Sequence, residues 1–115
     1  SKQKSGEIII VGSIDGVKPV PAPIHYAASK GALRSMTESL AKELGVDNIR
    51  VNLVAIGVLA GGIAKYLSRD LLESYLEHCS LKRVGTNREV AEMVVRLALH
   101  NSYVTGQTIV LDGGL

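Results

Sequence analysis

The sequence predicts an α/β fold with about three parallel strands and crossover helices. Two observations support this class: short apolar runs alternate with longer segments of helical periodicity, and Gly or Pro residues separate them. Strands that are joined by helical crossovers pair in parallel, and helices then cover both faces of the sheet. Because three strands are few for such a sheet, we expect the 115 residues to be part of a larger fold.

The first strand and the first helix are expected in the N-terminal part of the chain. Residues 7–11 form a β-branched run, and the Pro-rich residues 14–24 after it are expected to form a loop. A helix is then expected to begin at Tyr26 and to end at Leu44, with Gly45 as its C-cap. The apolar stripe of this helix consists of Leu33, Met36, Leu40 and Leu44.

The middle of the chain predicts a second strand and a second helix. Residues 50–56 are nearly all apolar, and the Gly-rich residues 57–62 that follow are expected to be flexible. Apolar residues at helical spacing then predict a helix over residues 63–78. Its stripe consists of Leu67, Leu71, Leu72 and Tyr75.

The last third of the chain begins with a helix start signal. Thr86 and Glu89 have the spacing of a capping box, in which each side chain satisfies a backbone N–H of the first turn. The helix that they open is expected to break at Asn101. After a turn at residues 105–106, residues 108–112 predict the third strand.

Three residues carry a chemical signal. Tyr26 and Lys30 are four positions apart and so share one face of a helix. The positive charge favours the ionised phenol and lowers the pKa of Tyr26 below its reference of about 10. Such a tyrosine can exchange a proton near neutral pH, and Ser13 could hold the oxygen that receives it. Taken together they indicate carbonyl–alcohol redox chemistry; taken singly, Tyr26 and Lys30 could be a surface pair and Ser13 a strand end.

Composition and charge exclude several classes of function. The net charge is +2, and the aromatic content is 3% without Trp or Phe, so nucleic acid is not an expected partner. The longest apolar stretch, residues 53–64, is too short and too rich in Gly to span a membrane. The histidines lack the spacing of metal ligands, so no metal site is expected. Cys79, the only cysteine, is expected to be a small apolar residue on a helix, in a protein of the reducing cytoplasm.

Several segments, taken in order, are similar to those of one protein family. They are residues 8–13, 26–32, 50–57, 81–85 with 89–91, 103–107 and 110–114. The chain resembles the C-terminal half of short-chain dehydrogenases/reductases, and in pattern it is closest to the β-ketoacyl carrier-protein reductases. A lone Tyr-x-x-x-Lys would be a weak signal. Its combination with Ser13 and the other segments is specific for the family, though not for a substrate.

The resemblance implies a Rossmann-like doubly wound fold and a reaction that depends on NADP or NAD. Hydride would pass between the nicotinamide and a small-molecule carbonyl or alcohol, while Tyr26 exchanges a proton with an oxygen that Ser13 orients. Lys30 would support Tyr26, and both would contact the cofactor. Gly57 and Leu59 would lie beside the nicotinamide through backbone groups, although a plain turn would explain these two residues nearly as well.

The chain departs from the family's pattern at Ile56, where a proline is usual, and at Gly61, where a threonine is usual. The Gly-rich turn that binds the cofactor pyrophosphate does not occur in these 115 residues. Residues 1–115 are therefore expected to be the C-terminal catalytic half of a single domain, without its dinucleotide-binding half, and inactive alone.

The resemblance also bears on partners. A homo-oligomer is expected through the helix that runs from Tyr26 to Leu44, with the C-terminal strand as a second contact. An open apolar strand edge would add to this tendency to associate. Residues 58–80 are expected to form a lid over the substrate. The alternative is a non-catalytic truncated relative that serves as an oligomerising or partner-binding module.

Overall fold

The computed structural model describes residues 5–14, 24–61 and 66–115, and at Tyr26 and Ala27 it describes the backbone alone. Most of the loop expected over residues 14–24 and the start of the helix expected at residue 63 lie outside these ranges.

Three parallel strands form the sheet, as predicted, and they are ordered β1-β2-β3 across it. β1 (Gly6–Ser13) pairs along its whole length with β2 (Ile49–Ile56). β3 (Thr108–Leu111) pairs with the second half of β2. The central strand therefore has a neighbour on both edges, and its Val51 and Val54 have no exposed surface. The predicted parallel α/β class is confirmed.

Two strand ends differ from the expectation. β1 continues past residue 11, because its pairing with β2 extends until Ser13 lies opposite Ile56. β3 stops at Leu111 rather than at Asp112. The carboxylate of Asp112 accepts a hydrogen bond of 3.0 Å from the backbone N–H of Gly114, and Gly113 adopts a φ of 67°. This local turn competes with the strand at its last residue.

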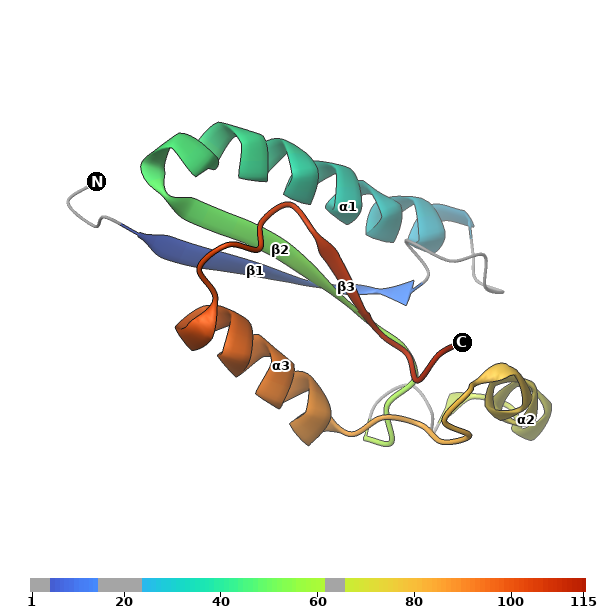
Figure 1. The fold of residues 1–115 in the computed structure, drawn as a ribbon. Helices are drawn as coiled ribbons and strands as arrows, with labels where there is room; N and C mark the ends of the chain where they lie inside the picture. The colour runs from blue at the N-terminus through green and yellow to red at the C-terminus, as the bar shows by residue number, and fades with distance from the viewer. Residues whose placement is uncertain (1–4, 15–23, 62–65) are drawn as a thin grey trace.

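Helices cover both faces of the sheet. α1 (Ile24–Leu44) and α3 (Asn87–His100) lie on opposite sides of it, and α2 (Arg69–His78) lies beyond the carboxyl ends of β2 and β3 (Figure 1). The core between sheet and helices is small. Among the described residues, its largest fully buried side chains are Thr37, Val51, Asn52, Leu53, Val54 and Cys79.

The C-cap expected at Gly45 is wrong. α1 tightens into a short 3₁₀ turn, η2 (Gly45–Asp47), and the left-handed residue that ends it is Asn48, with a φ of 57°. The backbone N–H of Asn48 donates to the carbonyl of Gly45 at 3.0 Å, and its carbonyl accepts from Gly6 at 3.2 Å. Asparagine tolerates the left-handed conformation, so the reversal into β2 takes place three residues later than predicted.

Side-chain caps determine where α2 and α3 begin. The capping box at Thr86 and Glu89 is present and opens α3, which ends before Asn101 as predicted. α2 begins at Arg69, because Ser68 accepts a hydrogen bond of 3.2 Å from the N–H of Leu71. Residues 67 and 68 are not helical, so within the described residues the predicted helix is present only from Arg69 onward. Cys79 is the C-cap of α2 rather than a residue on its face, so that expectation is also corrected.

Candidate active site

The carboxyl end of β1 and the N-terminal turns of α1 lie near each other (Figure 1). Ser13 is the last residue of β1, and Tyr26 and Lys30 belong to the first turns of α1. Lys30 is half-buried. The structure thus brings the backbone segments of these three residues to one end of the sheet. That their side chains meet stays a prediction, because the side chain of Tyr26 is outside the described part.

Gly12 lies where α1 packs closely against the end of β1. A Cβ added at Gly12 would lie 2.9 Å from a methyl carbon of Leu53 and 3.3 Å from one of Leu33. Gly12 precedes Ser13, and Leu33 lies on α1 one turn after Lys30. Gly12 therefore packs closely against these two leucines, and a larger residue here would require their side chains to shift.

The segment that follows β2 is held in place rather than flexible. The N–H of Gly57 donates to the carbonyl of Leu111 at 2.8 Å, which extends the sheet by one bond. On the other side the carbonyl of Val58 accepts from Gly85, and the N–H of Ala60 donates to Gly85, both at 2.9 Å. The flexibility expected of residues 57–60 is thus corrected, because neighbours on two sides satisfy their backbone groups.

Tyr75 makes a third contact to this segment. Its hydroxyl donates to the carbonyl of Asp112 at 3.0 Å and accepts a longer hydrogen bond of 3.4 Å from the N–H of Val58. Burial raises the pKa of Tyr75, so the hydroxyl keeps its proton. The sequence placed Tyr75 only on an apolar stripe. The polar role was missed because its partners are backbone groups at distant positions, which leave no pattern in the sequence.

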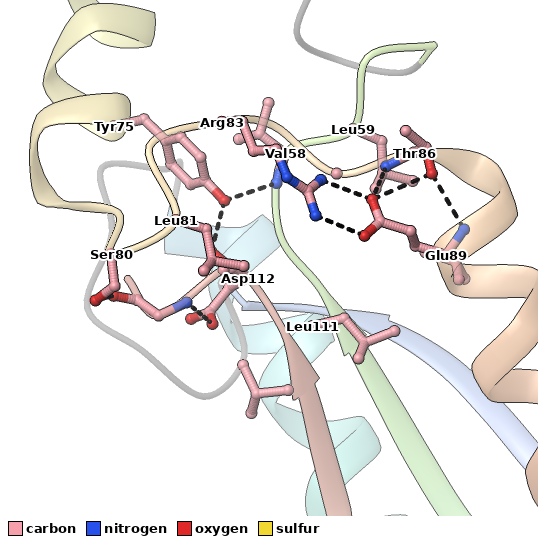
Figure 2. Close-up of a pocket in the computed structure, with 15 residues that line it drawn as sticks. Val58, Leu59, Tyr75, Ser80, Leu81, Arg83, Thr86, Glu89, Leu111 and Asp112 are labelled. Carbon is pink, nitrogen blue, oxygen red and sulfur yellow. Dashed lines mark hydrogen bonds and ion pairs between the residues drawn. The ribbon is translucent and has the colours of Figure 1, made fainter.

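A cavity of about 450 Å³ opens beyond the carboxyl ends of β2 and β3 (Figure 2). Apolar side chains, among them Leu59, Leu81 and Val90, form much of its wall. Tyr75 stands on one side of it, and α3 begins on the other. Side chains of the segment predicted to be a lid therefore do border a hollow.

A charged pair lies at the edge of this cavity. The guanidinium of Arg83 binds both carboxylate oxygens of Glu89 at 2.8 Å (Figure 2). The hydrogen bonds from Arg83, followed by the backbone N–H of Thr86, lower the pKa of Glu89 to about 2. The same carboxylate completes the capping box of α3. The pair therefore anchors the start of α3 and leaves no free carboxylate at this edge of the cavity.

The described residues hold no group of three or more His, Cys, Asp and Glu side chains that could bind a metal ion. Among their helices none combines the length and the apolar character that crossing a membrane requires.

Comparison with protein families gives one match over the whole chain. Residues 1–115 match the family model described as Enoyl-(Acyl carrier protein) reductase. Curated relatives include the 3-oxoacyl-[acyl-carrier-protein] reductases FabG of Thermotoga maritima, 43% identical over 115 residues, and of Chlamydia muridarum, 39% identical over 115 residues. Each alignment covers 99% of this chain, but 47% and 46% of the respective relative. The chain thus spans about half the length of the curated relatives it matches.

Solved structures of such reductases are also similar to this chain. A 3-oxoacyl-[acyl-carrier protein] reductase from Brucella melitensis superimposes with a TM-score of 0.88 at 35% identity, over 96% of this chain and 42% of the other. A structure of such a reductase from the same organism, with bound NAD, superimposes with a TM-score of 0.85 at 35% identity, over 96% and 40%.

Proposed function

The chain belongs to the short-chain dehydrogenase/reductase family, and on that premise we propose that it is the proton-handling part of a nicotinamide-dependent oxidoreductase. The reaction interconverts a carbonyl and an alcohol. The catalytic residues are Ser13, Tyr26 and Lys30. The observation that carries the proposal is that β1 delivers Ser13 to the end of the sheet over which α1 begins.

Each of the three residues has one task. The hydroxyl of Ser13 holds the substrate oxygen, and the phenol of Tyr26 donates a proton to it in reduction and removes that proton in oxidation. The ammonium of Lys30 lies one helical turn from Tyr26, stabilises its ionised form and binds the ribose of the cofactor. The nicotinamide, when bound, supplies or receives the hydride.

The backbone after β2 suits the nicotinamide end of such a cofactor. Ligands of open parallel sheets bind beyond the carboxyl ends of the strands, where Gly57 and Leu59 lie. Hydrogen bonds to Leu111 and Gly85 support this backbone on two sides. We therefore assign cofactor contacts to Tyr26, Lys30, Gly57 and Leu59, with either NAD or NADP as the cofactor. Ile56 and Gly61, the departures from the family's pattern, flank the segment and leave these backbone groups in place.

The names of the relatives point to a substrate class. The curated relatives cited above are 3-oxoacyl-[acyl-carrier-protein] reductases, so we propose a small 3-oxoacyl group as the substrate. The largely apolar wall of the cavity beside α2 suits an acyl chain.

We also propose that the protein forms a homo-oligomer through α1. Ala28, Ala32 and Met36 are exposed at helical spacing and form a stripe of small and apolar side chains. Met36, which was expected on one apolar stripe with Leu33, Leu40 and Leu44, is more exposed than those three residues. Small residues let two helices approach closely, and Met36 adapts to an irregular neighbour. The C-terminal strand is the second candidate contact, because β3 is at the edge of the described sheet.

The proposal is tested on the full natural chain, with the region that precedes residue 1 in the gene included. We expect it to oxidise NADH or NADPH in the presence of a 3-oxoacyl thioester. Tyr26→Phe should lower kcat by about 10²–10⁴-fold, the usual contribution of a general acid. Tyr103→Phe removes the same hydroxyl from a side chain that is 98% exposed and serves as the matched control.

Two outcomes would count against the proposal. If Tyr26→Phe has the same kcat as the parent, Tyr26 is not the proton donor that the proposal requires. A full chain that binds neither nucleotide nor substrate would favour the alternative, a non-catalytic module that oligomerises or binds a partner.

A further inference from the structure

The hydroxyl of Tyr75 joins three elements that are far apart in the sequence. Tyr75 belongs to α2, Val58 follows β2, and Asp112 follows β3. The hydroxyl donates to the carbonyl of Asp112 and accepts from the N–H of Val58, and Figure 2 shows it between the two backbones.

The chain leaves room for this hydroxyl at Gly57. A Cβ on Gly57 would lie 2.8 Å from the hydroxyl oxygen of Tyr75 and 3.0 Å from the Cα of Asp112. Real Cβ atoms do not approach an oxygen so closely, so any other residue here would displace Tyr75. The contact of Tyr75 with the backbone after β2 therefore depends on a glycine one residue before Val58.

The remaining contacts of the segment leave one side of it to Tyr75. β3 holds Gly57 through the carbonyl of Leu111, and Gly85 holds Val58 and Ala60 from the other flank. The N–H of Val58 is paired with neither strand nor loop, and Tyr75 is its partner. Loss of the hydroxyl would leave this part-buried N–H unpaired while the other bonds persist.

We propose that Tyr75 is a positioning residue: its hydroxyl sets the backbone of residues 57–59 for the nicotinamide and ties α2 to that backbone. The inference rests on the proposed function, because the nicotinamide contact of Gly57 and Leu59 is part of it. A displacement of α2 is then transmitted to the cofactor contact through the side chain of Tyr75. Tyr75 is not a catalytic residue in this role, because its hydroxyl is hydrogen-bonded to two backbone groups.

The test uses Tyr75→Phe in the full natural chain, with Tyr103→Phe as the matched control. Amide hydrogen exchange should become about tenfold faster at Val58, which corresponds to ~1.4 kcal/mol, the upper end of one neutral hydrogen bond. Fluorescence titration with NADH and with NADPH should show a Kd raised by about three- to tenfold. The KM for the nucleotide should rise with it, while kcat changes by less than about twofold. Tyr103→Phe should change none of these quantities.

A second variant keeps the test independent of the first. Gly57→Ala should weaken nucleotide binding in the parent, and it should weaken it less when Tyr75→Phe is already present, because the nearest clashing atom is then gone. Strict additivity of the two changes would overturn the proposal, as would unchanged exchange at Val58 and unchanged Kd in Tyr75→Phe. If the parent itself binds neither NADH nor NADPH, the proposed function fails and this inference fails with it. If the parent binds nucleotide and Tyr75→Phe binds it with the same Kd and the same exchange at Val58, the proposed function stands and only this inference is overturned.

Discussion

The side-chain amide of Asn52 donates a hydrogen bond of 2.8 Å to the backbone carbonyl of Val104. Asn52 lies in the middle of the central strand and has no exposed surface. Its carboxamide oxygen accepts from the N–H of Gln107 at 3.1 Å, so both ends of the amide are used. One buried side chain thereby holds the connection between α3 and β3 against β2. This explains why a polar residue interrupts the apolar run of β2.

Asn52→Leu should lower the free energy of unfolding by about 2–4 kcal/mol, because it leaves a carbonyl and an N–H unpaired beside the core. Leucine keeps the branched shape of asparagine and is larger, so the loss cannot come from a cavity. Chemical denaturation measures the effect. Asn87→Leu, at the exposed start of α3, should cost much less. Equal losses in the two variants would contradict the assigned role of Asn52.

The ion pair of Arg83 and Glu89 predicts an acid-dependent stability. The pKa of Glu89 is about 2 in the folded state and 4.5 as the reference value, so the unfolded state takes up the proton first as the pH falls. The contribution of Glu89 is therefore complete above about pH 4.5 and is lost between pH 4.5 and about pH 2. Unfolding midpoints at several pH values should show a smaller acid loss in Glu89→Gln than in the parent. Arg83→Leu should reduce the acid loss in the same way, and an unchanged acid profile in both would refute the prediction.

Gly113→Ala should be strongly destabilising, for two reasons. Gly113 has a φ of 67°, and left-handed backbone costs other residues about 1–2 kcal/mol. A Cβ there would also lie 2.7 Å from the sulfur of the buried Cys79, which adds a cost of overpacking. We expect a total loss of about 2–4 kcal/mol in denaturant unfolding, and a partial recovery when Cys79→Ala is added.

Gly45→Ala is the matched control for Gly113→Ala. Gly45 lies in η2 without a left-handed φ, and a Cβ there would meet no described atom within 4 Å. The substitution should be neutral or stabilise by about 0.4–1 kcal/mol. A large loss at Gly45 would show that the free space around it is occupied in solution.

The thiol of Cys79 should report global unfolding. The side chain has no exposed surface, and its sulfur lies 3.3 Å from the carbonyl oxygen of Gly113 and 3.4 Å from that of Asp112. An aromatic disulfide reagent should therefore label it slowly in the native protein and fully in concentrated denaturant, in step with the unfolding curve followed by circular dichroism. Complete labelling within seconds without denaturant would show that the α2–β3 contact opens locally.

The elements that local pattern encodes were predicted well. The alternation of apolar strands with amphipathic helices gave the parallel sheet, and Thr86 with Glu89 marked the start of α3 within one residue. Both signals operate over a few positions, so they can be read without the fold. The C-cap at Gly45 failed because the turn into β2 is decided by pairing between Asn48 and Gly6, which are 42 positions apart (48 − 6).

For the candidate site, the sequence alone determined the residue types and their spacing: a serine at the end of a strand and a Tyr–Lys pair one helical turn apart on the next helix. Only the tertiary structure decided which groups support them. Tyr75 reaches Val58 across 17 positions and Asp112 across 37, and its partners are backbone atoms of residues whose own side chains do not take part. Periodicity encodes contacts between near neighbours along the chain, whereas a hydrogen bond to a distant backbone group exists only once the strands and helices have packed.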